Sequence, residues 1–323
     1  MYITTENEQC GYAFTSLIEG TPKVSNIYEL LRKEEAMKEM DRRDFMKTVA
    51  IGGAVLGIGD ALLHKPLEAA PSAEQVEVLW LGHSTFRITS STGKVIVIDP
   101  FLKKNPRAPA KYKDLKALGK VDLILVTHGH LDHIGDLPEL AKLTGATVVA
   151  NHELARNLVS LGFLDGGKTI FMNKGGTVAP LGPSIKVHMV AADHSSSVDL
   201  LAIKPDATGV QHIAGGVPVG YVVEFENGFK IYDTGDTDVF GDMALINKFF
   251  KPDLALVCIG GHFTMDPDHA AYALRELIRP KQAIPTHYGT YPVINRTPAD
   301  LKTALGDAPI KVLDVKPGDA VKF

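Results

Sequence analysis

The feature that most constrains this chain is a short stretch of histidine and aspartate that directly follows an apolar strand pattern. Residues 121–126 read VDLILV, and residues 127–136 follow as THGHLDHIGD. A buried strand is a rigid support, so side chains in the loop after it can be held in fixed positions. A solvated loop would gain little from crowding three imidazoles together. The stretch therefore predicts a metal site on loops at the end of a sheet.

The spacing within this stretch indicates more than one metal ion. His128 and His130 alternate along the chain, whereas Asp132 and His133 are adjacent and can point elsewhere. Neutral imidazole suits zinc and several other first-row ions, and a carboxylate compensates their charge. Because four ligands so close in sequence can hardly all reach one ion, two ions are the economical solution. Each ion then needs further ligands from later in the chain.

Three later segments offer matching ligands. Each segment places one candidate after an apolar strand pattern and before small residues: His194 in AADHSSS, Asp236 in YDTGDTD and His287 in IPTHYGTYP. Taken singly, any one of these residues would more often be structural than a ligand. Together with the first stretch they form a set in which every member follows a strand.

From residue 76 onward the chain alternates strand and helix signals. VEVLWLG (76–82) and KVIVIDP (94–100) are typical of strands, and DLPELAKLTG (136–145) is typical of a helix with an Asp cap and a closing Gly. PVGYVVEFENGFKIYDTGD predicts a hairpin around residues 226–228, whereas residues 195–217 lack clear periodicity. We find no low-complexity linker in 76–323, so we expect one α/β domain of two sheets covered by helices.

Composition and charge narrow the range of partners. The 323 residues are 45% hydrophobic and 22% charged, with a formal net charge of −4. This profile is typical of a soluble globular protein with ample material for a core. Nucleic-acid binders usually present a basic face, so the mild acidity argues against nucleic acid as a partner. The two cysteines, Cys10 and Cys258, are far apart and predict no disulfide framework.

Residues 40–75 resemble a twin-arginine export signal. Arg42 and Arg43 precede Phe45 and Lys47 in the expected order, although Asp41 departs from the usual Ser or Thr. The apolar run at 48–63 that follows is too short and too interrupted to span a bilayer stably. We therefore expect export to the periplasm, with no stable membrane span after processing. If the segment is instead an amphipathic helix packed on the domain, the protein is cytoplasmic.

Residues 1–39 lie upstream of this signal, where a signal peptide normally has no leader. We expect them either to be disordered or to precede the true start codon, which would then be at Met37 or Met40. The catalytic domain is expected to span residues 76–323.

The ordered set of motifs over residues 76–323 resembles the metallo-β-lactamase superfamily. The segments LGHSTF, VIVIDPF, GHLDHIGD, HSSS, GDT, FTMDP and PTHYGTYP are more closely similar to a family of small metal-dependent hydrolases that includes the ascorbate-6-phosphate lactonase-like proteins. The resemblance implies a four-layer αββα sandwich with a binuclear site at one edge.

The resemblance also implies a ligand set. One ion would be bound by His128, His130 and His194, the second by Asp132, His133 and His287, with Asp236 bridging both. Asp99 matches the superfamily's structural aspartate, which supports the metal loops without ligating. His130 stands where oxygen-reducing diiron relatives carry Glu, which favours hydrolysis with two divalent ions, Zn²⁺ first and Mn or Fe as alternatives.

Two such ions imply a hydrolytic mechanism. They would bring the pKa of a shared water from about 15.7 towards about 7, so that a metal-bridging hydroxide is available at neutral pH. That hydroxide would attack a carbonyl or a phosphorus, and the ions would stabilise the oxyanion. Asp132 is the predicted catalytic residue, because it can orient the nucleophile while binding its ion. The predicted substrate is a small-molecule ester, lactone or phosphoester.

Other histidines and aspartates receive weaker predictions. His83, in LGHSTF, is expected to contact a ligand residue or the substrate. His262, in GGHFTM, either donates a proton to the leaving group or is a buried histidine with a satisfied ring. Asp233 is expected to accept hydrogen bonds from backbone amides. Ordinary helix, strand or loop roles are expected for His152, His188, His212 and His269.

Two alternative functions stay open at this point. A nuclease or phospholipase-type phosphodiesterase of the same superfamily would need a basic channel or an apolar entry surface, and the sequence has no insertion rich in Lys and Arg. A non-catalytic metal-binding protein is the other alternative, against which the complete ligand set argues. The sequence leaves the oligomeric state open.

Overall fold

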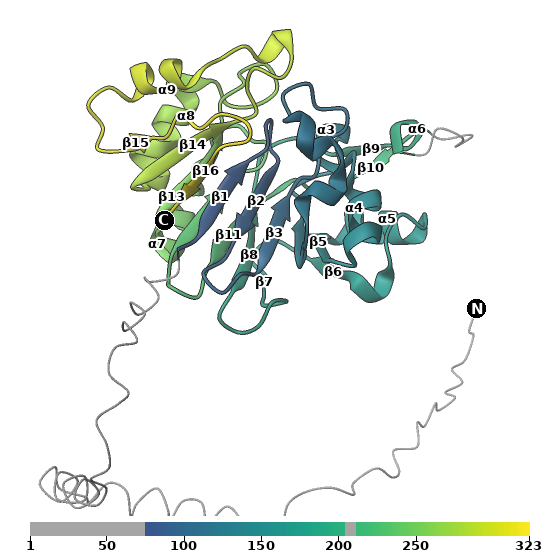
Figure 1. Cartoon of the computed structure of the whole chain (residues 1–323). Coiled ribbons are helices and arrows are strands. Elements are labelled where there is room, and N and C mark those ends of the chain that lie inside the picture. Colours follow the sequence, from purple (N-terminus) through teal and green to yellow (C-terminus); the bar gives the residue numbers. More distant parts are fainter. Residues whose placement is uncertain (1–74, 204–210) are drawn as a thin grey trace, which may run out of the picture. The chain divides into compact units, whose positions relative to one another are not determined.

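Short apolar strands build a first sheet of seven strands. The computed structural model describes residues 75–203 and 211–323 (Figure 1). The predicted export signal and the segment before it therefore lie outside the described residues, except for Gln75. In sheet order the strands are β16 (Ala320–Lys322), β1 (Glu77–Trp80), β2 (Phe86–Thr89), β3 (Val95–Ile98), β4 (Leu123–Leu125), β5 (Thr147–Asn151) and β6 (Thr169–Met172).

A second sheet of seven strands packs against the first. Its order is β15 (Lys311–Val312), β14 (Gln282–Thr286), β13 (Leu254–Cys258), β12 (Lys230–Asp233), β11 (Val219–Glu224), β8 (Lys186–Ala191) and β7 (Thr177–Val178). Strands β11 and β12 are antiparallel, with Glu224 opposite Lys230. The hairpin predicted around residues 226–228 is therefore confirmed.

Successive side chains along the central strands of the first sheet belong alternately to two apolar layers, one on each face of the sheet. In β3, Ile96 and Ile98 belong to the core that includes residues of both sheets. Val95 and Val97 point the other way, into the core shared with the outer helices. Because successive side chains of a strand face opposite sides, one nearly continuous apolar run serves both layers.

Helices cover the outer face of each sheet (Figure 1). Buried residues of α4 (Leu137–Thr144) and α5 (His152–Ser160) join the core on the outer face of the first sheet. The second sheet is covered by α7 (Met243–Phe250), α8 (Pro267–Tyr272), the π-helical segment η4 (Ala273–Ile278) and α9 (Pro298–Leu305). The predicted four-layer αββα sandwich is thus confirmed. Within the described residues, none of the helices is long and apolar enough to cross a membrane.

The helix predicted at 136–145 forms as α4, but its first residue does not cap it. The Asp136 carboxylate accepts hydrogen bonds from the backbone N–H groups of Leu102 and Lys103, at 2.5 and 2.9 Å. It ties the loop after β3 to the start of α4 and makes no side-chain capping bond. At the other end, Gly145 has φ +66°, a left-handed conformation that ends a helix as predicted.

Residues 195–217, for which no periodicity was found, contain short elements outside the two sheets. They are β9 (Ser197–Asp199), α6 (Leu200–Ile203) and β10 (His212–Ala214), with β9 and β10 paired antiparallel. Side chains of the main body hold the segment at its base. The Asn151 amide donates to the carbonyls of Gly215 and Val217, and the Gly129 N–H donates to the Ser196 hydroxyl. Tertiary hydrogen bonds, which leave no periodic signal, therefore define these elements.

Candidate metal centre

Six strands that run in the same direction within their sheets bring the predicted ligands together. In the first sheet β1, β3 and β4 are co-directional, because β2 is antiparallel to both β1 and β3. In the second sheet β8, β12 and β14 are likewise co-directional. Each of the six is followed by at least one of the predicted residues: His83, Asp99, His128, His194, Asp236 and His287. The site thus lies at the carboxyl ends of the strands, the common place for ligands in α/β sheets.

The first group of donors consists of three histidines from two loops. His128, His130 and His194 have ring nitrogens that lie within 4.8 Å of one another. Nε2 of His128 is 2.9 Å from Nδ1 of His130, and the rings of His128 and His194 are perpendicular at 5.1 Å. This is the predicted set for one ion, and we call it the all-histidine group.

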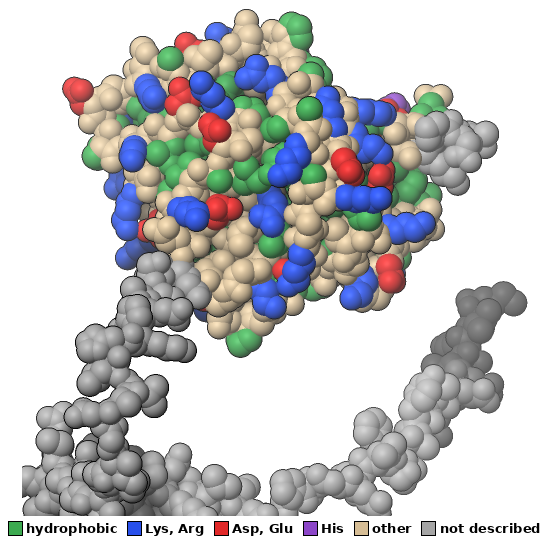
Figure 2. All heavy atoms as spheres, in the orientation of Figure 1, with side chains coloured by type: hydrophobic (Ala, Val, Ile, Leu, Met, Phe, Trp, Pro, Cys, Tyr) green, Lys and Arg blue, Asp and Glu red, His purple; other side chains and the backbone are tan. Residues whose placement is uncertain are grey.

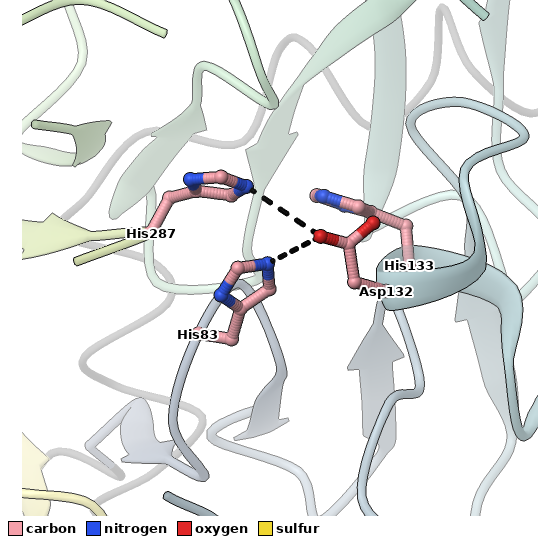
Figure 3. A group of neighbouring side chains, drawn as sticks. All are labelled: His83, Asp132, His133 and His287. Atoms are coloured by element: carbon pink, nitrogen blue, oxygen red, sulfur yellow. Dashed lines mark hydrogen bonds and ion pairs between the residues drawn. The ribbon is translucent and has the colours of Figure 1, made fainter. Parts of the chain in front are cut away.

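The second group combines a carboxylate with histidines. Asp132, His133, His287 and also His83 place their donor atoms within 4.8 Å of one another. Figure 3 shows the rings of His83 and His287 directed at Asp132, whose Oδ2 is 3.1 Å from Nε2 of His83 and 4.0 Å from Nε2 of His287. We call this set the carboxylate group. It contains the three ligands predicted for the second ion, with His83 as an additional member.

Asp236 lies between the two groups. Its Oδ2 is 2.9 Å from Nε2 of His287 and 3.3 Å from Nε2 of His133, both in the carboxylate group. The same oxygen is 3.8 Å from Nε2 of His194, in the all-histidine group. One carboxylate therefore reaches both sets of donors, as a bridging ligand must.

Asp99 supports the ligands from behind. Its carboxylate accepts from the backbone N–H and the hydroxyl of Thr127, at 2.8 and 2.6 Å, and contacts Nδ1 of His133 at 2.7 Å. The Thr127 hydroxyl, having donated to Asp99, accepts from Nδ1 of His128 at 3.0 Å. Both histidines therefore carry their hydrogen on Nδ1, and Nε2 faces the centre. Such outer partners fix the tautomer and orientation of metal-binding histidines.

Electrostatics divide the centre into neutral rings and charged carboxylates. Burial, and secondarily the charge of His133, holds the pKa of His128 well below its usual value. Burial also lowers the pKa of His130 and of His194. Burial alone would raise the pKa of Asp236, but the neighbouring His287 and His133 hold it well below its usual value. Neutral imidazoles and an ionised carboxylate are the forms that bind metal ions.

His133 carries the opposite shift. Burial would lower its pKa, but the carboxylates of Asp236 and Asp99 outweigh burial and raise that pKa well above its usual value. The two carboxylates thus attract positive charge to this ring in the absence of a metal ion. A divalent cation bound there would replace the proton.

Backbone conformation at the site is unusual for non-glycine residues. His83, Asp99 and His287 have φ values of +57°, +45° and +53°. Such conformations each cost about 1–3 kcal/mol and persist where the surrounding structure imposes them. The backbone at one of them is closely packed: a Cβ at Gly260 would collide with the carbonyl oxygen of His287. The fold therefore holds these ligand and support residues in place before any ligand arrives.

The donors also fit a metal ion by what they leave unpaired. Oδ1 of Asp236 is buried and has no hydrogen-bond partner among the described residues. A buried, ionised carboxylate oxygen without a partner is costly. A cation between the two groups would remove that cost, so the residues present fit a metal centre.

Comparison with known proteins identifies the family. Residues 94–288 match the family model described as "Beta-lactamase superfamily domain". A UPF0173 metal-dependent hydrolase of Cupriavidus necator is 50% identical over 277 residues, which cover 84% of this chain and 95% of the relative. Another, from Cupriavidus taiwanensis, is 52% identical over 256 residues, covering 78% and 88%. The chain belongs to the UPF0173 metal-dependent hydrolases, within the metallo-β-lactamase superfamily.

A solved structure agrees with this family assignment. Igni18, a metallo hydrolase from the archaeon Ignicoccus hospitalis, superposes with a TM-score of 0.66 at 34% identity. The match covers 77% of this UPF0173 chain and 98% of Igni18. The described fold and the family membership together make this protein a metal-dependent hydrolase.

His262 lies outside both donor groups of this UPF0173 hydrolase. Its exposed ring packs edge-on against Phe263, at 4.5 Å between centroids. The ring lines a hollow of about 280 Å³ that is also lined by Asp193, the neighbour of His194. The alternative of a buried, satisfied histidine is therefore wrong, because the segment after β13 turns outward.

The remaining predicted side chains of the hydrolase have ordinary partners. Oδ1 of Asp233 accepts from the Gly235 N–H at 3.3 Å, as predicted for that turn. His188 contacts the Thr177 hydroxyl and the ring of Phe250. His269 pairs with Asp238, and His152 packs against Phe171.

Two functional contacts were missed from the sequence. Thr127 and Thr290 both hydrogen-bond to histidines of the centre, and both stand inside motifs that we quoted. A hydroxyl residue next to a predicted ligand is a signal in itself, because metal-binding imidazoles need a partner for their second nitrogen. Thr127 satisfies that signal directly. Thr290 is three residues from His287 but contacts His83, so only the fold reveals its partner.

Proposed function

We propose that this metal-dependent hydrolase is binuclear and hydrolyses a small-molecule ester, lactone or phosphoester. The observation that carries the proposal is Asp236, whose one oxygen approaches His194 on one side and His133 and His287 on the other. The ions would be held by His128, His130 and His194, and by Asp132, His133 and His287, with Asp236 shared. Zinc is the proposed metal, with manganese and iron as the alternatives.

Asp236 and Asp132 receive different roles in hydrolysis because they differ in burial. When bound, the two cations supply an activated water at neutral pH and stabilise negative charge on the substrate. Asp236 is 3% exposed and is enclosed by ligand histidines. The side chain of Asp132 is 28% exposed and is the only carboxylate in the two donor groups. Asp132 therefore orients the attacking water by accepting a hydrogen bond from it.

The ionisation of Asp132 suits this role. Burial would raise its pKa, but the hydrogen bond from His83 and the charge of His133 outweigh burial and lower that pKa. The carboxylate is thus ionised at neutral pH and able to accept a hydrogen bond from that water. The hollow beside His262 is the proposed space for the leaving group, because it adjoins the loop of His194. The motif resemblance to ascorbate-6-phosphate lactonase-like proteins favours the lactone as the first substrate to test.

The surface gives less support to a nuclease. On the face shown in Figure 2, Lys and Arg side chains are scattered, with Asp and Glu between them, and do not gather into one stripe. Tracking a nucleic-acid backbone needs a continuous basic groove. A non-catalytic role is disfavoured because the donor set is complete.

Export by the twin-arginine route is a separate proposal about the same protein. It rests on the sequence of residues 40–75 and makes residues 76–323 the mature domain. This route carries folded proteins with cofactors already loaded, which suits a centre held by residues from both sheets. Fractionation of cells that express the full chain tests it. Recovery of the protein only in the cytoplasm, also after long expression, would contradict it.

Metal content measured together with activity tests the proposed function. Purified full-length protein is analysed for metal and assayed on a panel of lactones, carboxylic esters, phosphomonoesters and phosphodiesters. We expect two divalent ions per chain, hydrolysis of at least one class, loss of activity with chelator, and recovery with Zn²⁺. One ion per chain at saturation would overturn the binuclear proposal. Two ions without turnover of any class would favour the non-catalytic alternative.

A further inference from the structure

His83 is a fully buried histidine that belongs to the carboxylate group but was not predicted as a ligand. It lies in the turn between β1 and β2, and each ring nitrogen has one side-chain partner. Nε2 is 3.1 Å from Oδ2 of Asp132, and Nδ1 is 2.9 Å from the hydroxyl of Thr290. The ring therefore connects two segments of the chain that are 158 residues apart, since 290 − 132 = 158.

We propose that His83 is a positioning residue that fixes the Asp132 carboxylate, and that Thr290 fixes the ring of His83 for this task. The inference rests on the proposed role of Asp132. It adds a hydrogen-bonded chain, Thr290 to His83 to Asp132, in which the expected contact of His83 is assigned to Asp132 and the role of Thr290 is new. Figure 3 shows the His83 ring directed at Asp132.

Donor and acceptor chemistry sets the direction of this chain. An ionised carboxylate only accepts hydrogen bonds, so the hydrogen of the neutral imidazole must lie on Nε2. Nδ1 then has to accept, and the Thr290 hydroxyl is the donor within reach. With its hydrogen donated to Asp132, Nε2 has no lone pair to offer a metal ion. The arrangement therefore makes His83 a partner of a ligand and not a ligand.

The backbone around His83 keeps its ring from turning to another partner. Its carbonyl accepts from Nε1 of Trp80 at 3.0 Å and from the N–H of His287 at 3.2 Å. Its own φ is +57°, in the left-handed region. The side chain is further enclosed by the ring of His287 at 4.0 Å and that of Phe101 at 5.9 Å. Such a tightly held donor can set the orientation of the more exposed Asp132.

Four variants of the full-length protein test the proposal: His83→Ala, His83→Gln, Thr290→Val and Thr290→Ser. The readouts are Zn²⁺ ions per chain at saturation, Zn²⁺ affinity by chelator competition, turnover, and the thermal unfolding midpoint. Removing an outer partner of a metal ligand typically costs roughly 10- to 100-fold in metal affinity or activity. We expect His83→Ala to keep two ions at saturation but to lose affinity or turnover within that range.

The conservative variants separate positioning from mere structural support. His83→Gln keeps an N–H donor at a similar reach and is expected to recover most of the loss. Thr290→Val removes the hydroxyl at nearly constant volume and is expected to weaken Zn²⁺ binding or turnover, whereas Thr290→Ser recovers it. In the His83→Ala background, Thr290→Val should add nothing further, because the two act through one chain.

Two controls probe similar residues elsewhere. Thr169→Val removes a buried hydroxyl that donates to the Asp165 carbonyl at 2.7 Å, at the start of β6. His152→Ala removes an exposed histidine of α5. Both are expected to leave the Zn²⁺ affinity unchanged, whatever they do to the unfolding midpoint.

The results that overturn the proposal are specific. If His83→Ala and His83→Gln both bind one ion fewer at saturation, His83 is a ligand. If His83→Ala matches the native protein in affinity and turnover, His83 has no role at the centre. Asp132→Asn tells these failures from failure of the proposed function. If Asp132→Asn has native-like activity, the proposed role of Asp132 itself is wrong. If Asp132→Asn loses activity while His83→Ala stays native-like, only the positioning role of His83 is refuted.

Discussion

The two donor groups of the centre differ in how firmly the fold supports them. In the carboxylate group, His133 hydrogen-bonds to Asp99. Asp132 contacts His83, which hydrogen-bonds in turn to Thr290. In the all-histidine group, His128 has such a partner in Thr127. Within the described residues, the ring of His130 hydrogen-bonds to Nε2 of His128 and to no residue outside the group, and the side chain of His194 is 11% exposed.

This difference implies unequal ion binding. The carboxylate group has an ionised ligand, two outer hydrogen-bonded chains and left-handed backbone at both His83 and His287. We therefore expect its ion to be held more tightly and to survive mild chelation. The all-histidine group lacks a carboxylate of its own and depends on Asp236 for charge compensation. The predictions below use this contrast, beginning with the residue that belongs to both groups.

Asp236→Asn is expected to have the largest effect, because it removes the charge that both groups share. Metal catalysis typically contributes several kcal/mol of charge stabilisation, so a fall in turnover of about 10³-fold or more is expected. The measurement is turnover together with metal content. Asp253→Asn is the matched control, since it changes a carboxylate that accepts from the Lys230 N–H at the opposite ends of β12 and β13. Equal losses in both variants would count against a shared ligand.

His130→Ala is expected to empty only one group. The variant should bind one ion per chain at moderate metal concentration and lose most of its activity, while far-UV circular dichroism stays native. His133→Ala, in the other group, should instead lose the more tightly held ion and part of its stability, because it leaves the buried Asp99 without its His133 partner. Native-like turnover of His130→Ala with metal bound would show that the all-histidine group is not part of the site.

Asp99→Asn tests the comparison further, because it weakens the contacts that support His133 and Thr127 without replacing a predicted ligand. An amide keeps the shape but no longer supplies charge to His133 and Thr127, so a loss of roughly 10- to 100-fold in metal affinity or activity is expected. The loss should be larger in the carboxylate group, where Asp99 contacts His133 directly, than in the all-histidine group, which Asp99 reaches only through Thr127. Competition with a graded series of chelators measures the two affinities. Asp122→Asn is the control: it accepts from the Val95 N–H beside β4, at the other end of the same sheet. If Asp122→Asn reduces the metal affinity as much as Asp99→Asn does, the supporting role assigned to Asp99 is contradicted.

The sequence brought out the candidate ligands, but it did not bring out the contacts that hold them. His128, His130, Asp132 and His133 are neighbours in sequence, and the later ligands each follow a strand, so local pattern was enough to propose them. The apolar patterns at 76–82 and 94–100 likewise predicted strands, and these form as β1 and β3. These features are local, and local features are what periodicity records.

The support around the ligands is long-range and was therefore not predictable. Thr290 meets His83 across 207 residues, and Asp136 leaves its expected capping position to bind the loop after β3. The segment that contains β9, α6 and β10 is held by Asn151 and Gly129, which belong to other parts of the chain. In each case a tertiary hydrogen bond overrides or completes the local preference, and one sequence without its fold carries no sign of which residues will meet.

Proton release on metal binding is the finest test of the contrast. The pKa of His133 is raised above its usual value, chiefly by Asp236 against the effect of burial, so this ring is protonated at neutral pH without metal. A cation entering the carboxylate group must expel that proton, and its affinity should rise with pH through the neutral range. Burial lowers the pKa values of His128, His130 and His194, so the all-histidine group is already unprotonated and its affinity should fall only below about pH 6.5.

Calorimetric titration in buffers of different ionisation enthalpy measures this proton directly. With native protein at pH 7, the Zn²⁺ binding event at the carboxylate group should release the His133 proton in addition to any proton lost by the shared water, and should therefore release more protons than the other event. In His130→Ala the remaining event should be the one with the larger release. If instead the remaining event is silent in every buffer, the carboxylate group does not hold its histidine charged, and the proposed inequality between the two groups is wrong. Proton release on Zn²⁺ binding thus tests the electrostatics of the site independently of any substrate.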